Sequence, residues 1–305
     1  MNSSYLFWMG GSALIAAGVH FFLTKGLKKR GLLTALTLIF GILLGAAAAR
    51  LCYCLIEFEY VQADGWGYTL LSDSMEYVSF YGGMAGVIFA AILAAYITGN
   101  KPMDALNAYA PAGALMACLA RFGEYFLGRT CTGKQIEESF WQFFPVAIGE
   151  EYYGDVEWYL AVFMLAGLCY LAVFLLSLLK FRDRRFVRTL FYLCLPQIFC
   201  ESLRSMSLIW TQFLRVEQLA CMICMEVILI LYGVWAGKGA KHRFLPALGA
   251  LGCAGVFVAC EFALDKTNLP HVVTYGIMIL FLAVLAWLEI TGFQRLKKQE
   301  AARKF

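Results

Sequence analysis

Apolar runs of about twenty residues recur along the whole of this chain, with short polar breaks between them. The hydrocarbon core of a bilayer is roughly 30 Å thick, and a helix of about 20 residues crosses it. We expect helices because lipid offers no partner to an unpaired backbone group. Hydrophobic residues make up 61% of the chain and charged residues only 15%, which excludes an ordinary soluble domain. The sequence therefore predicts an all-α, polytopic integral membrane protein.

Nine of these runs are predicted to span the membrane. We expect the long, acidic and aromatic stretch 128–155, between the fourth and fifth spans, to form a small head at the outer membrane interface. An ordinary aromatic belt is the alternative reading of its rings. The predicted spans are 5–24, 31–56, 78–98, 104–127, 156–179, 186–204, 217–236, 244–263 and 270–291.

Basic residues are distributed unevenly between the two sides of this predicted bundle. Most of the 25 Lys and Arg residues follow the odd-numbered spans or close the chain, while the stretch 57–77 contains none. The positive-inside rule makes the basic side cytoplasmic. This places the N-terminus outside and the C-terminus in the cytoplasm.

Charged and polar side chains interrupt several spans toward their outer ends. A charged side chain in mid-membrane costs on the order of 2.5–3.5 kcal/mol, so each one needs a reason. Because the spans alternate in direction, these residues share one leaflet, and their convergence predicts a site. They are Arg50, Tyr81, Arg121, Glu124, Glu201, Arg204 and Gln218, and Gly82 and Gly83 directly follow Tyr81.

Two pairs in this set are spaced i to i+3, Arg121 with Glu124 and Glu201 with Arg204. Each pair can meet on one helix face, either as a structural ion pair or as part of a site. With Arg50 the arginines outnumber these carboxylates. That surplus suits an anionic lipid headgroup, because guanidinium forks match phosphate geometry.

Other residues of the spans allow two readings. Gly82 and Gly83 either pack helices closely or admit a ligand to the backbone. Glu226, near the middle of the seventh span, is either hydrogen-bonded in its protonated form or part of a proton- or ion-binding site. Glu289 is expected to lie close enough to the inner interface to be solvated.

Neither a metal site nor a nucleic-acid interface is predicted. Cys221 and Cys224 have metal-ligand spacing, but they lie inside a span without a second pair, so we read them as buried apolar residues. The net charge of +4 is explained by membrane orientation.

Several motifs coincide with the predicted site. Residues 45–53 read GAAAARLCY and residues 79–86 read SFYGGMAG. Glu201 and Arg204 form a Glu-x-x-Arg motif, and Gln218 opens the seventh span. The fourth span carries Asp104, Pro111, Arg121 and Gly123, and Gly128 directly follows it. In these motifs the sequence resembles the prolipoprotein diacylglyceryl transferase family.

The resemblance implies an architecture. The family has seven spans, an outer N-terminus, an inner C-terminus and a head between spans four and five. Residues 1–236 would then form a seven-span domain in a bacterial cytoplasmic membrane. Residues 237–305 would add two spans and a basic cytoplasmic tail.

The sequence departs from the family pattern at several positions. Tyr81 occupies the place of the histidine in the family's His-Gly-Gly motif, and Glu124 that of an asparagine. Arg129 replaces a glutamate and Gln197 an arginine. These changes bear on catalysis more than on fold.

The function implied by the resemblance is transfer of diacylglyceryl from phosphatidylglycerol to the cysteine thiol of a prolipoprotein signal peptide, without a metal or organic cofactor. Arg50, Arg121 and Arg204 would bind the lipid phosphate, and Tyr81 or Glu201 would take the thiol proton. Gly82, Gly83, Glu124 and Gln218 would support the site. The alternative is a non-catalytic amphiphile binder or transporter on the same fold, for which Glu226 would matter.

Overall fold

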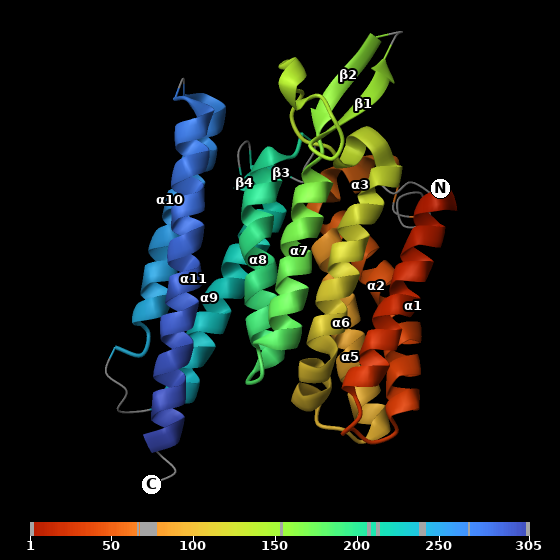
Figure 1. Ribbon diagram of the computed structural model, residues 1–305, viewed down its shortest axis with the longest axis vertical. Coiled ribbons are helices and arrows are strands. Elements are labelled where there is room, and N and C mark those ends of the chain that lie inside the picture. The colour runs from red at the N-terminus through yellow and green to blue at the C-terminus, as the bar shows by residue number, and fades with distance from the viewer. Residues whose placement is uncertain are drawn as a thin grey trace. The chain divides into compact units, whose positions relative to one another are not determined.

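The computed structural model describes residues 3–65, 67, 78–152, 155–205, 209–211, 214–237, 242–267 and 269–302. The chain forms two compact units. Figure 1 labels their helices and strands. The first comprises Met1–Leu190 and Leu203–Leu208, and the second comprises Phe191–Ser202 and Ile209–Phe305.

Within the described residues, seven helices are long and apolar enough to cross a membrane. This confirms a helical, polytopic membrane protein. Two further long helices, α6 (Pro102–Gly123) and α8 (Arg185–Leu203), are not among the seven, so the count of nine spans stays a prediction. The seven are α1 (Ser3–Leu23), α2 (Arg30–Ile56), α5 (Phe80–Thr98), α7 (Val162–Leu179), α9 (Val216–Ala236), α10 (Leu245–Lys266) and α11 (His271–Ala302).

In the first unit, small residues let α2 and α5 approach closely (Figure 1). A Cβ added at Gly82 would lie 2.6 Å from the Cβ of Cys52 and 2.7 Å from the carbonyl oxygen of Ala48. One added at Gly86 would collide with the carbonyl oxygen of Leu44. Helices pack in lipid largely through such small-residue contacts. The packing interpretation of Gly82 is therefore confirmed.

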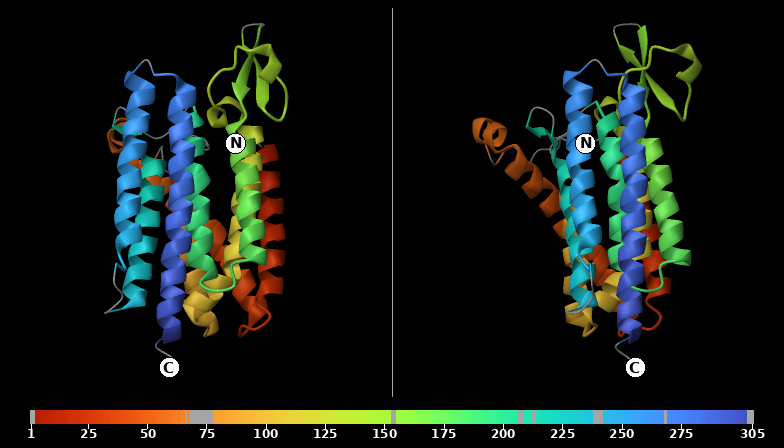
Figure 2. Two further views of the ribbon diagram at one scale, coloured as in Figure 1. Left: turned by 60° about the vertical axis from the view of Figure 1, so that its left-hand side comes forward. Right: turned by 90° about the vertical axis from the view of Figure 1, so that its left-hand side faces the viewer.

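A small β-hairpin follows α6 in the first unit and projects beyond the ends of α6 and α7 (Figure 2). Strand β1 (Ala147–Tyr152) pairs antiparallel with β2 (Asp155–Leu160). Before it come the 3-10 helices η1 (Glu124–Cys131) and η2 (Ser139–Trp141). The rings of Phe140 and Trp141 are exposed. A short helix, α3 (Phe58–Asp64), follows α2.

Two predicted span boundaries differ from the ends of the helices. The predicted fifth span began at 156, but residues 155–160 form β2 and α7 begins at Val162. Alternating apolar and polar residues in β2 were absorbed into the hydrophobic run that follows. The fourth predicted span ran to 127, whereas α6 ends at Gly123. A purely all-α description therefore misses the hairpins.

The second unit contains α9, α10, α11, the Phe191–Ser202 part of α8 and a short hairpin. Helices α10 and α11 lie side by side (Figure 2). Its hairpin pairs β3 (Ile209–Thr211) with β4 (Leu214–Arg215).

One expectation about the second unit is wrong. Glu289 was predicted to be solvated, but it is 0% exposed. Its two carboxylate oxygens accept hydrogen bonds from the hydroxyls of Tyr192 and Tyr232, each at 3.1 Å. Two tyrosines on neighbouring helices provide the polar partners that a buried carboxylate needs.

Candidate functional site

Glu124 bridges two arginines in the first unit. Arg121 lies in the last turn of α6 and is 1% exposed, and its Nη1 donates to Glu124 Oε1. Nη2 of Arg204 donates to Glu124 Oε2 at 2.5 Å. The expected Arg121–Glu124 pair is confirmed. Two guanidinium groups thus meet at one carboxylate, and guanidinium N–H groups match the geometry of carboxylate and phosphate oxygens.

The backbone around Arg204 is held by the loop that follows η1. The amide of Lys134 donates to the carbonyl of Leu203 at 3.2 Å, and the amide of Ser205 donates to the carbonyl of Thr132 at 3.2 Å. These bonds position Arg204 immediately after α8. Backbone hydrogen bonds between two segments that are distant in the sequence thus hold Arg204 near Glu124. The sequence pattern does not reveal this pairing.

Two aromatic rings also lie close to Arg121. Its guanidinium carbon lies 3.9 Å from the ring centre of Phe80 and 6.0 Å from that of Tyr170. The two rings are stacked with their centres 6.5 Å apart. A cation over an aromatic face is stabilised by the ring quadrupole. The rings and Glu124 together allow a fully buried arginine.

Tyr81 lies in the first turn of α5, next to Phe80. Ser79 caps this helix, because its hydroxyl oxygen accepts a hydrogen bond from the Gly82 amide at 3.2 Å. The hydroxyl of Tyr81 lies 3.4 Å from that of buried Tyr170. Through Tyr170 and Phe80, Tyr81 is linked to the surroundings of Arg121.

The remaining predicted residues of the first unit are Arg50 on α2 and Gly83 on α5. Gly83 is half-buried, and a Cβ added there would be 3.6 Å from the Cβ of Ala49, an ordinary contact distance. Arg50 is half-buried in the last two turns of α2. The amide of Ser79 donates to the Ala49 carbonyl at 3.0 Å, which ties the start of α5 to this part of α2.

Glu201 and Gln218 belong to the second unit. Glu201, on α8, is 1% exposed and accepts a hydrogen bond from Gln197 Nε2 at 2.8 Å. The same nitrogen lies 3.2 Å from Glu217 Oε2. One amide thus serves two buried carboxylates. The sequence paired Glu201 with Arg204, whereas the contacts described here join Glu201 to Gln197 and Arg204 to Glu124.

Gln218 lies in the first turn of α9 and is 0% exposed. Its Nε2 donates to Glu261 Oε1 at 2.6 Å, to Ser202 Oγ at 2.8 Å and to the carbonyl of Ile198 at 2.9 Å. Nε of Arg215 lies 3.9 Å from the other Glu261 oxygen. Three segments of the second unit therefore meet at Gln218.

Sequence reasoning missed several residues of these clusters. Glu261 is a charged residue within the predicted eighth span, so the cost of burying charge could have singled it out. Glu217 directly precedes Gln218, but it was taken as the start of the span. Phe80 and Tyr170 resemble any buried aromatic residue, and nothing in the sequence distinguished them.

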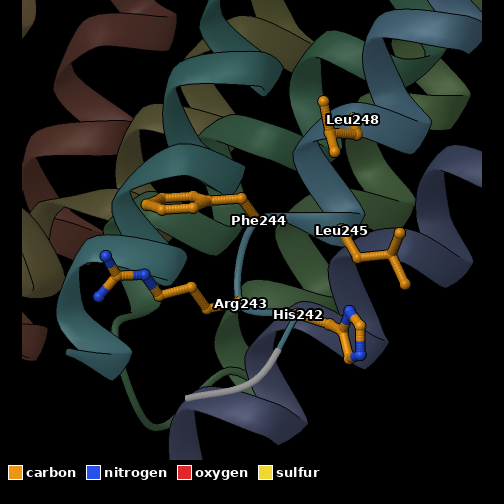
Figure 3. Close-up of a pocket in the computed structure, with 5 residues that line it drawn as sticks. All are labelled: His242, Arg243, Phe244, Leu245 and Leu248. Atoms are coloured by element: carbon orange, nitrogen blue, oxygen red, sulfur yellow. The ribbon is translucent and has the colours of Figure 1, made fainter. Parts of the chain in front are cut away.

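Two other features lie apart from the predicted set. Glu226 is half-buried in α9. A hollow of about 350 Å³ at the start of α10 is lined by none of the residues that the sequence singled out. In Figure 3, Arg243 and Phe244 point to one side of it and His242 and Leu245 to the other. Among the residues that the structure describes, no group of three or more His, Cys, Asp or Glu side chains is arranged to hold a metal ion.

Comparison with known proteins supports the resemblance seen in the motifs. The family model described as prolipoprotein diacylglyceryl transferase matches residues 6–235. A phosphatidylglycerol–prolipoprotein diacylglyceryl transferase of Staphylococcus carnosus (strain TM300) is 23% identical over 255 residues, which covers 79% of this chain and 91% of the relative. The family match spans well over half of the chain and includes the residues described around Glu124, Glu201 and Gln218, except Glu261. The chain therefore belongs to the prolipoprotein diacylglyceryl transferase family.

Proposed function

We propose that this protein transfers the diacylglyceryl group of phosphatidylglycerol to the lipobox cysteine thiol of prolipoproteins, at the outer face of a bacterial cytoplasmic membrane. Family membership and the name of the Staphylococcus relative support the reaction. The proposed orientation, with the N-terminus outside and the C-terminus in the cytoplasm, is supported by the asymmetry of the basic residues.

The observation that carries the proposal is the bridge of Arg121 and Arg204 across Glu124. Placing two buried or nearly buried guanidinium groups next to each other in a membrane costs free energy, and a role in binding an anionic substrate would explain why both are present. We assign Arg121 and Arg204, with Arg50, to the phosphate of the lipid. Guanidinium binds phosphate through paired N–H donors.

The proposed reaction is a displacement at the diacylglyceryl carbon that bears the phosphate. The thiolate sulfur forms a bond to this carbon, the bond from carbon to phosphate oxygen breaks, and glycerol phosphate leaves. Its phosphate changes from one formal negative charge to two when this bond breaks. Arginines that contact the phosphate oxygens stabilise that added charge in the transition state.

A base must take the thiol proton. We assign this role to Tyr81, whose hydroxyl is linked through Tyr170 to the surroundings of Arg121, with Glu201 as the second candidate. Gly82 lets α5 approach α2 closely, with Gly83 next to it, and Glu124 and Gln218 orient polar partners.

The test is a transfer assay with purified full-length protein. Phosphatidylglycerol labelled in its acyl chains is incubated with a lipobox peptide and with the same peptide carrying serine in place of cysteine. We expect label in the cysteine peptide alone. Lipid binding without transfer to the cysteine peptide would favour the binder or transporter, and Glu226→Gln would then be the variant to test in transport.

A further inference from the structure

The hollow at the start of α10 lies outside the region that matches the family. That match ends at residue 235, and α10 begins at Leu245. The hollow has a volume of about 350 Å³, within the range of small-molecule sites. Its lining combines two basic side chains, His242 and Arg243, with Phe244, Leu245 and Leu248. None of these five residues is acidic, so the hollow favours an anionic ligand.

Two other helices of the second unit hold the turn at 242–244 that lines this hollow. Phe244 packs on α9, where a Cβ added at Gly233 would lie 2.5 Å from Phe244 Cδ1 and 3.1 Å from the Arg243 carbonyl oxygen. In α11, Nη1 of Arg295 donates to the carbonyl oxygen of His242 at 3.1 Å. Glycine at 233 and an arginine on α11 therefore fix the backbone that carries the lining side chains.

The Arg243 side chain is placed to bind an anion. Its guanidinium carbon lies 4.7 Å from the centre of the Phe244 ring, so one face of the cation lies over an aromatic ring. A guanidinium group in this arrangement keeps the N–H donors in its plane for other partners. Within the described part of the chain, this side chain donates no hydrogen bond and forms no ion pair. Phosphate oxygens accept paired N–H donors from such a group.

Leu245 and Leu248 give the hollow an apolar border. They are 50% and 66% exposed, and their spacing of three residues places both on one face of α10. Because α10 is long and apolar enough to cross a membrane, its exposed leucines meet acyl chains in a bilayer. A ligand that contacts both Arg243 and these leucines therefore carries an anionic group and a hydrocarbon chain.

We propose that this hollow binds an anionic phospholipid, with the phosphate at Arg243 and an acyl chain along Leu245 and Leu248. Arg295, which contacts His242, adds positive charge close to the site. Basic pockets between membrane helices bind anionic lipid headgroups. With the proposed orientation, this lipid comes from the cytoplasmic leaflet, whereas the proposed transfer takes place at the outer face. The bound lipid is therefore a different molecule from the one that reacts.

The experiment uses purified full-length protein in detergent and phosphatidylglycerol that carries a photoreactive diazirine in one acyl chain. After irradiation, crosslinked peptides are identified by mass spectrometry. We expect a crosslink to the peptide that contains Leu245 and Leu248. Unlabelled phosphatidylglycerol should compete more strongly than phosphatidylcholine, whose headgroup has no net charge, and free glycerol phosphate should not compete. Absence of the crosslink, equal competition by the two lipids, or competition by glycerol phosphate at the same concentration would overturn the proposal.

Arg243→Gln removes the proposed phosphate ligand. We expect the yield of this crosslink to fall roughly fivefold, the effect of one arginine near an anionic headgroup. Arg182→Gln, at an exposed arginine of the first unit, is the control and should keep the parent yield. An unchanged yield in Arg243→Gln contradicts the proposal. An equal fall in both variants also contradicts it, because that result indicates general attraction to a basic surface.

Leu248→Gln provides a second variant, at an exposed side chain on which folding does not depend. It should lower the yield by removing part of the apolar border, and a parent yield would overturn the proposal. Leu14→Gln, at a leucine of α1 that is 65% exposed, is its control. Because crosslinking is measured without transfer, failure of the transfer assay would reject the proposed function and leave this result interpretable.

Discussion

Arg204 and Glu124 are 80 residues apart in the sequence, yet Nη2 of the arginine donates to Oε2 of the glutamate at 2.5 Å. Arg121 uses the other oxygen of the same carboxylate. Glu124 therefore makes the positions of the two arginines depend on each other. In a buried setting, removing one member of such a network affects all of its partners.

We expect Glu124→Gln to destabilise the protein, because two arginines lose their shared anion. Removing one partner of a buried ion pair costs about 3–5 kcal/mol, and the remaining amide oxygen should hold the loss below that range. The thermal unfolding midpoint in detergent measures this. Glu137→Gln, at an exposed glutamate, is the control. Adding Arg204→Gln should cost less than the sum of the two single changes; simple additivity would refute the shared network.

Arg121→Ala should lose transfer at normal membrane abundance, because it removes a proposed phosphate ligand. Arg121→Lys should recover only part of the activity, since an ammonium group lacks the paired N–H donors. The measurement is the initial transfer rate per amount of inserted protein, with exposed Arg182→Ala as the control. Parent-like transfer by the alanine variant would exclude Arg121 from the phosphate site.

How far the sequence predicted this site differs from residue to residue. Arg121 and Glu124 were identifiable together because charge is costly in lipid and an i to i+3 spacing lets two side chains meet on one helix. The pairing of Arg204 with Glu124 was not, since it depends on backbone hydrogen bonds between the segments around Thr132 and Leu203. Local spacing instead favoured Glu201 as the partner.

The same limits apply to the fold. Apolar runs identified every long helix, because hydropathy and length are properties of one segment. The start of α7 was missed, since the strand β2 has enough Val, Trp, Tyr and Leu to extend an apolar run. Burial of Glu289 depends on Tyr192 and Tyr232 from other helices, which no single segment reveals.

Gly86→Ala should destabilise the α2–α5 contact. The added Cβ would collide with the Leu44 carbonyl oxygen and lie 2.9 Å from the Ala48 Cβ. Overpacking of this kind costs about 1–3 kcal/mol. The unfolding midpoint should fall for this variant and stay near the parent value for Gly10→Ala, where no atom lies within 4 Å of the added carbon. Equal midpoints for the two variants would contradict the close packing.

Tyr81→Phe should abolish transfer and leave phosphatidylglycerol binding nearly intact, if the phenol takes the thiol proton. A phenol has an ordinary pKa near 10, so the parent rate should rise with pH above neutrality. Tyr81→His should keep or increase transfer at neutral pH, because imidazole titrates near pH 6.5. If the parent protein is active and Tyr81→Phe transfers at the parent rate, Tyr81 is not the base and Glu201 becomes the candidate.

Cys131 tests the proposed orientation. It lies at the end of η1 and is half-buried, whereas the other cysteines lie within helices. A membrane-impermeant maleimide added to intact spheroplasts should label mainly Cys131, and Cys131→Ser should remove most of the label. Equal labelling of the parent protein and of Cys131→Ser would contradict the outer location of Cys131.

The most direct test of the central claim follows both products of the proposed displacement. Phosphatidylglycerol labelled in its headgroup glycerol is supplied with a lipobox peptide, and released glycerol phosphate and thioether-linked peptide are quantified together. We expect release to depend on the peptide cysteine, one glycerol phosphate to appear for each thioether, and Arg121→Ala to abolish both. Release without peptide, or bound phosphatidylglycerol that yields neither product, would contradict the proposed reaction.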